Sequence, residues 1–339
     1  MNTIVGAGSV GLALAVRLAH LGPVQLLTRR PEAAVRLADG LVAEDPATGI
    51  RQRVQVHAAH RWEDADAVGE GTVFVCTRLP DTEDVARELA HYAPKALAVS
   101  VQNGLDGGSR LARHLPRIVC CVWRQTATRV TDAHVRFTGT GRVIVGAPRG
   151  CDTGGAAEHL ASQLGQAGLD ASCSTHIERD QWLKLCINLM SAPNALVRRE
   201  DHVRREFVEV KARLLEEARD ALAAAGISAE PCDARDRTLD AEIVHQRTAL
   251  ERGTAARPLP LYNHVWTALR EGRSLEAGHY HERILELARA GRIPAPANSR
   301  VREVLLRTEA EGGGPESVAA ADLLPGGLLS RDRARTQGA

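Results

Sequence analysis

The sequence contains few aromatic residues, no excess of one charge and no long apolar run. Only 3% of the 339 residues are aromatic, and the formal net charge is +1. Such a balance gives no indication of nucleic acid or an anionic membrane as a partner. No apolar run reaches about 18 residues, which a membrane-spanning helix needs. No secretory signal pattern precedes the first predicted strand, and we expect a cytoplasmic protein that binds neither nucleic acid nor membrane.

Cysteine patterns typical of zinc sites and disulfide frameworks are also missing. The seven cysteines are odd in number and never have Cys-x-x-Cys spacing, which argues against both kinds of site. Adjacent Cys120 and Cys121 lie in a predicted buried strand and are expected to serve packing. His279 and His281, two apart on a predicted helix, point to different faces and are expected at the surface. We therefore expect no metal.

A glycine-rich turn at the start of the chain carries the clearest signal. The first eleven residues read MNTIVGAGSVG, in which a short apolar strand leads through a GxGxxG pattern into an apolar helix. Gly6 permits the tight turn, Gly8 lets the backbone approach a pyrophosphate, and Gly11 lets the helix pack closely on the strand. Amides at the start of the helix would face the phosphates. The context favours a dinucleotide site over a structural turn, and this site comprises Gly6, Ala7, Gly8, Ser9, Val10 and Gly11.

The residues after the second predicted strand, 24–27, distinguish between the two nicotinamide cofactors. An NAD-preferring site usually has a carboxylate here to hold the ribose hydroxyls. This chain instead has Thr28, Arg29 and Arg30, with no acid before Glu32. The two arginines can hold a 2′-phosphate, and Thr28 can add a hydroxyl. The alternative is a pair of solvated arginines in a turn; the pattern favours NADP(H).

Two kinds of pattern divide the chain. In the first half, strands are predicted at 71–76, 96–101, 117–122, 133–138, 141–146 and 171–173, a hairpin at 41–57, and helices at 10–20, 81–93 and 156–167. Only helices follow, at 178–190, 200–225, 232–250, 261–271, 276–290 and 297–308. Because alternating strands and helices form largely parallel sheets, we predict an α/β Rossmann-type, doubly wound N-terminal domain and an all-α C-terminal domain.

The domain boundaries follow from these patterns. Residues 1–174 are predicted to form the NADP-binding Rossmann domain, and residues 175–311 an α-helical substrate and catalytic domain. Residues 312–339, rich in glycine and basic at the end, are expected to form a flexible tail. We expect the chemistry where the two domains meet, because the reactive end of a cofactor projects past the carboxyl ends of the strands.

Lys184 and Asn188 form the most suggestive pair in the helical half. They are four residues apart and share one face of the helix predicted at 178–190, among apolar residues. A lysine is costly to bury in so apolar a helix, and desolvation would lower its pKa into a useful range. The alternative is a lysine whose ammonium extends to water.

Several motifs, in order, resemble the ketopantoate reductase (2-dehydropantoate 2-reductase) family over about residues 1–310. They are GAGSVG at 6–11, TR at 28–29, VCTR at 75–78, VQNGL at 101–105, HVRFTGTG at 134–141, WLKLCIN at 182–188 and GRSLE at 272–276. The resemblance implies an NADPH-dependent oxidoreductase of pantothenate biosynthesis with a Rossmann domain and an all-helical domain. A small carbonyl compound would be the substrate, and the protein would be a monomer or homodimer.

The resemblance also implies roles for individual residues. Lys184 would protonate the carbonyl oxygen as hydride arrives from nicotinamide C4, and Glu276 would orient Lys184 and the substrate hydroxyl. Asn103 would lie beside the nicotinamide ribose and the substrate, and Asn188 would position substrate oxygens. Taken singly, a turn asparagine, a helix amide and a surface carboxylate are the alternative interpretations of Asn103, Asn188 and Glu276.

The chain departs from the family pattern around the substrate. Where a second substrate-binding asparagine is usual, Ala192 precedes a proline and Asn194 is displaced by two residues. Where a serine is expected upstream of Glu276, the sequence has Pro260 or its neighbours. These changes bear on specificity, because a pocket that cannot pair a substrate's polar groups rejects it strongly.

Arginines offer a replacement for the lost substrate contacts. Arg78 stands where the family usually has lysine, and either Arg78 or Arg124 could bind a carboxylate. We predict reduction of 2-dehydropantoate to pantoate first, and another 2-oxo acid, ketone or imine of a specialised pathway as the alternative. A non-catalytic NADP-binding sensor is a further alternative, although such a sensor needs neither Lys184 nor Glu276.

Overall fold

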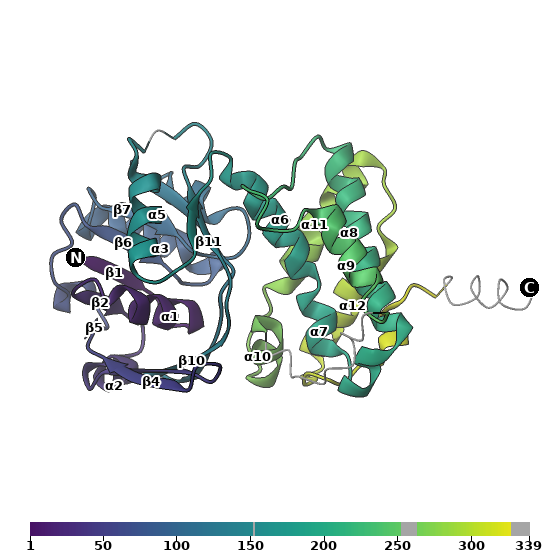
Figure 1. The fold of residues 1–339 in the computed structure, drawn as a ribbon, viewed down its shortest axis with the longest axis horizontal. Helices are drawn as coiled ribbons and strands as arrows, with labels where there is room; N and C mark the ends of the chain where they lie inside the picture. The colour runs from purple at the N-terminus through teal and green to yellow at the C-terminus, as the bar shows by residue number, and fades with distance from the viewer. Residues whose placement is uncertain (152, 252–262, 327–339) are drawn as a thin grey trace, which may run out of the picture. The chain divides into compact units, whose positions relative to one another are not determined.

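Two compact units make up the chain, Met1–Gln181 (unit 1) and Trp182–Ala339 (unit 2). The computed structural model describes residues 1–151, 153–251 and 263–326 (Figure 1). Unit 1 is α/β, and the described part of unit 2 is almost entirely helical. The predicted fold class, a Rossmann-type domain followed by an all-α domain, is confirmed.

The main sheet of unit 1 has eight strands in the order β12-β11-β8-β7-β6-β1-β2-β5. In chain order these are β1 (Asn2–Val5), β2 (Val24–Leu27), β5 (His57–Ala59), β6 (Thr72–Val75), β7 (Leu97–Ser100), β8 (Ile118–Trp123), β11 (Val143–Gly146) and β12 (Ala171–Cys173). All neighbouring strands are parallel except β8 and β11, which are antiparallel. The helices of the unit are α1 (Ser9–Leu18), α2 (Pro31–Ala38), α3 (Thr82–Tyr92), α4 (Gly107–Leu111) and α5 (Ala156–Gln166).

Both faces of this sheet are covered, as the apolar strands require. Ile4 belongs to a core that contains Leu12 of α1 and Leu160 of α5. Its neighbour Val5 belongs to a separate core with Leu89 of α3. Since successive side chains of a strand point to opposite faces, the two cores lie on the two sides of the sheet. The sheet is therefore doubly wound, as predicted.

A second, four-stranded sheet in the order β4-β3-β10-β9 corrects part of the prediction. It comprises β3 (Leu41–Asp45), β4 (Ile50–Val54), β9 (Thr126–Thr131) and β10 (His134–Gly139). The hairpin of β3 and β4 and the strand at 133–138 were predicted, but β9 and a separate second sheet were not. β3 and β10 bury alternate residues, and β4 and β9 have no buried residue, unlike the fully buried β8 of the main sheet, because the second sheet packs only one face on α1.

Unit 2 is built around α8 (Arg205–Ala224), on which α9 (Leu239–Arg247), α11 (Ala277–Gly291) and α12 (Pro296–Ala310) pack. The other described elements are α6 (Ile177–Leu189), which begins in unit 1 and continues into unit 2, α7 (Ser191–Leu196), α10 (His264–Arg270) and the short 3-10 turns η3 (Arg199–Val203) and η5 (Ala320–Leu323). The predicted helix at 200–225 starts late because its first residues form η3. The helix predicted at 232–250 starts at Leu239, where the Thr238 hydroxyl accepts a hydrogen bond from the Ala241 amide at 3.2 Å.

The prediction of a flexible tail from residue 312 is wrong for residues 312–326. Val197 and Val318 form a parallel bridge, and the Ala320 amide donates to the Asp201 carboxylate at 3.1 Å. Leu323 is fully buried. Apolar side chains and a paired backbone hold this segment on unit 2, while residues 327–339 lie outside the described residues.

Several cysteines are buried in the interiors of the two units. Cys120 and Cys121 lie in β8, and Cys186 lies in α6. Each is a free thiol. Burial raises the pKa of the Cys120 and Cys186 thiols to about 12, so both remain protonated near neutral pH.

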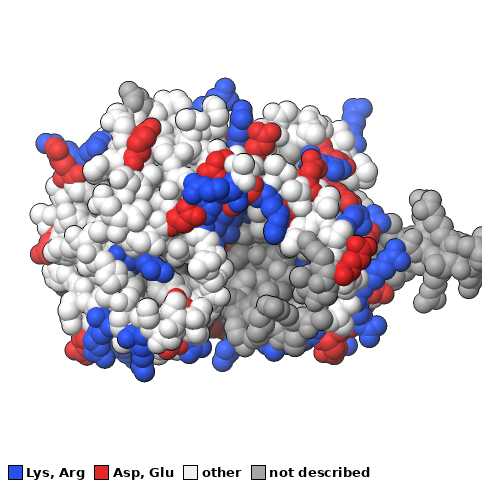
Figure 2. Space-filling model, viewed as in Figure 1, with Lys and Arg blue, Asp and Glu red and all other residues white. Residues whose placement is uncertain are grey.

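Charges of both signs are interspersed over the face that Figure 2 shows, in keeping with the net charge of +1. Among the described residues, no helix combines the length and the apolar character needed to span a membrane.

Candidate active site

The glycine turn has the geometry that a nucleotide phosphate requires. Gly6 adopts φ +112°, and a Cβ there would lie 2.9 Å from the carbonyl carbon of Cys76. A Cβ on Gly11 would lie 1.9 Å from the Gly6 oxygen, which shows how closely α1 approaches the turn. Gly8 precedes α1, and a Cβ built on it would meet no described atom within 4 Å. The backbone at Gly8 is therefore open to a ligand, and the first amides of α1 are suited to bind an anion there.

The close approach at Gly11 gives a first prediction. Gly11→Ala is expected to lower the free energy of unfolding by about 1–3 kcal/mol or more and to weaken dinucleotide binding, because the added methyl group overlaps the turn. Urea denaturation and cofactor titration measure the two effects. Gly165→Ala in α5, where a Cβ meets no described atom within 4 Å, is the control and is expected to stabilise by up to about 1 kcal/mol. Equal stability of the two variants would contradict the prediction.

A cavity of about 790 Å³ opens beside the turn. Its wall includes Gly6 and Gly8 after β1, Thr28 after β2, and Thr77 after β6. These strands are adjacent and parallel, so their carboxyl ends form one edge of the sheet. Ligands of open α/β sheets bind at this edge, and the volume falls in the range of small-molecule and cofactor sites.

Two arginines of the cavity wall share one carboxylate. Arg29 donates to both oxygens of Asp81 at 3.1 Å, and Arg78 lies 3.5 Å from the same group. The side chain of Arg29 is 73% exposed, so this pair is weak enough for Arg29 to exchange partners. Arg78, predicted to bind the substrate, thus lies next to Arg29 in the wall of the cavity beside the glycine turn.

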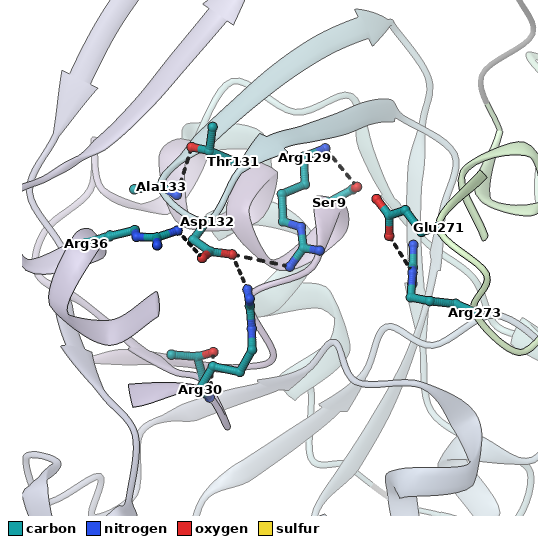
Figure 3. Close-up of polar contacts among 10 residues, drawn as sticks. Ser9, Arg30, Arg36, Arg129, Thr131, Asp132, Ala133, Glu271 and Arg273 are labelled. Carbon is teal, nitrogen blue, oxygen red and sulfur yellow. Dashed lines mark hydrogen bonds and ion pairs between the residues drawn. The ribbon is translucent and has the colours of Figure 1, made fainter. Parts of the chain in front are cut away.

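A second arginine cluster surrounds Asp132, whose side chain is only 8% exposed (Figure 3). Arg30 forms an ion pair with Asp132, as do Arg36 at 2.9 Å and Arg129 at 3.8 Å. The Arg129 amide donates to the Ser9 hydroxyl at 3.0 Å, which ties β9 to the glycine turn. Nothing in the sequence marks Arg36, Arg129 and Asp132, because their link to Arg30 exists only once the second sheet has formed.

Three other residues predicted to bind the cofactor occupy more constrained positions. Thr28 is buried, and its hydroxyl accepts a 3.5 Å hydrogen bond from the Arg30 amide. Val10 packs on the core of the main sheet. Asn103 is half-buried after β7, between Gln102 and Gly104, the latter with φ +97°. The Gln102 amide donates to the Thr82 hydroxyl at 2.7 Å, which fixes the turn before Asn103.

In unit 2, the predicted catalytic residues gather in one place. Lys184 is half-buried on α6, and Glu276 immediately precedes α11. The rings of His264 and Tyr280 meet edge to face with their centroids 6.0 Å apart. Burial and, second, the charge of Lys184 lower the pKa of His264 to about 4. Burial and, second, Glu276 raise the pKa of Tyr280. Lys184 and Glu276 are thus linked through the His264–Tyr280 pair.

The two asparagines predicted to bind substrate lie on neighbouring helices of the same unit. Asn188 is buried on α6, and Asn194 is half-buried on α7. α7 packs against α10, which carries His264. Pro260, where a serine was expected, lies outside the described residues. Neither His264 nor Tyr280 was identified from the sequence, since nothing in its pattern shows that the two rings meet near Lys184 and Glu276.

One histidine prediction is wrong. His279 is exposed, as expected, but His281 is fully buried and its Nδ1 lies 2.9 Å from Oδ1 of Asn298. It faces the interior because α11 packs on α8 and α12. Within residues 1–151, 153–251 and 263–326, no group of three or more histidine, cysteine or acidic side chains is arranged to hold a metal ion.

Curated proteins with similar sequences are 2-dehydropantoate 2-reductases. The 2-dehydropantoate 2-reductase of Halobacterium salinarum is 28% identical over 207 residues, which cover 58% of this chain and 62% of that protein. Its Archaeoglobus fulgidus counterpart is 28% identical over 191 residues, which cover 56% of this chain and 61% of that protein. The matched region therefore spans about three fifths of the length of these curated relatives.

Solved structures share the fold over nearly the whole chain. A ketopantoate reductase from Ralstonia eutropha has a TM-score of 0.72 at 22% identity, covering 92% of this chain and 99% of that chain. D-mandelate dehydrogenase with NADH and anilino(oxo)acetate has a TM-score of 0.75 at 17% identity, with the same coverage.

Family models match both halves of the chain in order. Residues 3–150 match the model described as ketopantoate reductase PanE/ApbA. Residues 176–309 match the model of the C-terminal part of the same proteins. Together with the glycine turn and the lysine helix on which the resemblance was based, these matches show that the chain belongs to the ketopantoate reductase family.

Proposed function

We propose that this protein is an NADPH-dependent reductase of a 2-oxo acid, with 2-dehydropantoate as the first candidate. One observation carries the proposal: Lys184 and Glu276 gather with His264 and Tyr280 in unit 2. A protein that only binds a cofactor needs no such cluster. We assign cofactor binding to residues 1–174 and the proton-transfer residues to residues 175–311.

The cofactor assignment is supported by the fit of the cavity in unit 1. Gly8 leaves room for a pyrophosphate against the backbone, Gly6 permits the tight turn before it, and the amides of α1 are suited to the phosphate charge. Arg29 and Arg78 would hold the 2′-phosphate that distinguishes NADPH from NADH. We therefore assign Arg78 to the cofactor in place of the substrate carboxylate. The choice rests on these arginines, since D-mandelate dehydrogenase, which shares the fold, is described with NADH.

The chemistry required of the protein is proton donation and charge stabilisation. A bound nicotinamide supplies the hydride. Hydride addition to a ketone produces an alkoxide, and the Lys184 ammonium would both stabilise that charge and donate the proton to the oxygen. Glu276 would orient Lys184 and the substrate hydroxyl, while Asn103, Asn188 and Asn194 would position substrate oxygens.

A reductase of a different 2-oxo acid is the second candidate. Ala192 stands where the family usually has a second substrate-binding asparagine, so this chain lacks one of the side chains that would hydrogen-bond ketopantoate. The D-mandelate dehydrogenase structure contains anilino(oxo)acetate, a bulkier oxo acid, in a protein of the same fold. Changed polar contacts of this kind alter substrate choice by orders of magnitude without altering the reaction.

A substrate panel tests the proposal directly. The purified protein is mixed with NADPH or NADH and with 2-dehydropantoate, other 2-oxo acids, simple ketones or imines, and loss of reduced-cofactor absorbance is followed. We expect the highest kcat/KM with a 2-oxo acid and NADPH. A faster ketone or imine would show that the substrate class is wrong, and no oxidation with any compound would identify a non-catalytic cofactor-binding protein.

A further inference from the structure

Two shielded polar atoms lie near the predicted catalytic residues, one on His264 near Lys184 and one on Tyr280 near Glu276. Nε2 of His264 and the hydroxyl of Tyr280 are shielded from solvent and make no hydrogen bond within the part of the chain that the structure describes. Tyr280 is only 4% exposed. Buried polar groups in native proteins nearly always have a partner, because leaving one unsatisfied is destabilising. Such atoms therefore indicate a ligand or an ordered water.

The two atoms belong to one local arrangement. The edge-to-face contact holds the two rings 6.0 Å apart. Asn263 fixes the start of α10: its Oδ1 accepts from the Trp266 amide at 2.9 Å, and its Nδ2 donates to the Ser191 oxygen at 2.8 Å. This second bond ties α10 to α7, where Oδ1 of Asn194 is a third buried atom without a hydrogen bond among the described residues.

Electrostatics define what these groups can bind. His264 titrates well below neutral pH, since burial and the nearby Lys184 charge lower its pKa to about 4, so its imidazole is neutral. Burial, with Glu276, raises the pKa of Tyr280, so its hydroxyl keeps its proton. A neutral imidazole in its Nε2–H form and a phenol both donate hydrogen bonds. With its proton on Nε2, His264 would supply one uncharged donor near the Lys184 ammonium, and the Tyr280 hydroxyl would supply a second one near Glu276.

We propose that His264 and Tyr280 bind the oxygens of the 2-oxo acid and determine which oxo acid is accepted. The proposal rests on the proposed function and deepens it. Lys184 then donates to the carbonyl oxygen, and His264 and Tyr280 donate hydrogen bonds to the carboxylate or to a hydroxyl of the substrate. A site built to hydrogen-bond such oxygens rejects compounds that lack them, because its buried donors would stay unpaired.

Tyr280→Phe and His264→Phe test the proposal, because each removes one polar group and keeps an aromatic ring. With the best 2-oxo acid of the panel, KM is expected to rise ~10-fold or more in each variant, with a smaller change in kcat. Titration with the same oxo acid should show a matching rise in Kd. The melting temperature of Tyr280→Phe should not fall, since the hydroxyl has no hydrogen bond to the described chain. His264→Gln, which restores a side-chain N–H, should recover part of the affinity.

His202→Phe is the matched control. His202 is a buried histidine of the same unit whose ring stacks on Phe207 and whose Nε2 lies 3.2 Å from the Val197 oxygen. Its replacement removes a hydrogen bond within the protein. We expect a lower melting temperature and an unchanged KM.

The outcomes separate this proposal from the proposed function. If the wild type reduces oxo acids and both phenylalanine variants keep its KM and Kd, the proposal is wrong and the reductase assignment stands. Lower melting temperatures with unchanged KM would likewise overturn it, in favour of an ordered water. If the wild type reduces no oxo acid but binds one more tightly than the variants do, the binding site at His264 and Tyr280 is supported and the proposed reductase function is wrong. If it neither reduces nor binds an oxo acid, both are overturned.

Discussion

Replacing Lys184 by alanine is expected to lower kcat by ~100-fold or more, while NADPH binding remains unchanged. The variant loses the group that would donate a proton to the forming alkoxide and stabilise its charge. The glycine turn and the arginines assigned to the cofactor all belong to unit 1 and are unaffected. Steady-state kinetics with the best oxo acid measure kcat, and fluorescence titration measures the Kd for NADPH.

Lys211 supplies the matched control for this experiment. It is a second partly buried lysine of unit 2, its ammonium lies 4.4 Å from the centre of the Phe207 ring, and burial lowers its pKa to about 8. Lys211→Ala should lower stability through lost packing and cation–π contact but keep kcat within about threefold. If kcat is unchanged in Lys184→Ala, or falls equally in both variants, Lys184 is not the proton donor.

Arg29→Ala is expected to weaken NADPH binding by roughly 10- to 100-fold and NADH binding by much less. Hydrogen bonds to charged groups contribute about 1.5–3 kcal/mol, and a fork of two such bonds to a phosphate exists only with NADPH. Calorimetric titration of each variant with both cofactors gives the ratio of the two dissociation constants.

Arg117→Ala controls for the general loss of one positive charge in unit 1. Arg117 is exposed, donates to the Lys95 oxygen at 3.3 Å and does not line the cavity beside the glycine turn. Its loss should change both dissociation constants little. An Arg29→Ala variant that weakens both cofactors equally would refute the choice of NADPH over NADH.

The features predicted correctly from the sequence depend on interactions between residues that are close in the chain. Gly6 needs its positive φ, and Gly11 needs the absence of a Cβ, whatever the rest of the chain does. The buried apolar strands of the main sheet and the amphipathic helix α8 likewise carry their patterns within a few residues. These local signals were enough to predict the fold class and the tight glycine turn before α1.

The features that were missed depend on contacts between distant segments. Asp132 meets Arg30 and Arg36 only because β10 pairs with β3 in the second sheet. His264 lies at the start of a short helix, and no periodicity could show that its ring would meet Tyr280 edge to face. The roles of Lys184 and the other site residues, and the domain boundary near residue 174, remain predictions.

The buried thiols give each unit an internal probe of its own opening. Cys120 lies in a central strand of unit 1 and Cys186 in a helix of unit 2, and both stay protonated near neutral pH. An alkylating reagent attacks only the thiolate of an accessible cysteine, so either site reacts when the structure around it has opened. Mass spectrometry of the modified peptides can therefore follow local unfolding of the sheet and of the helical bundle separately, in the natural sequence and without an introduced label.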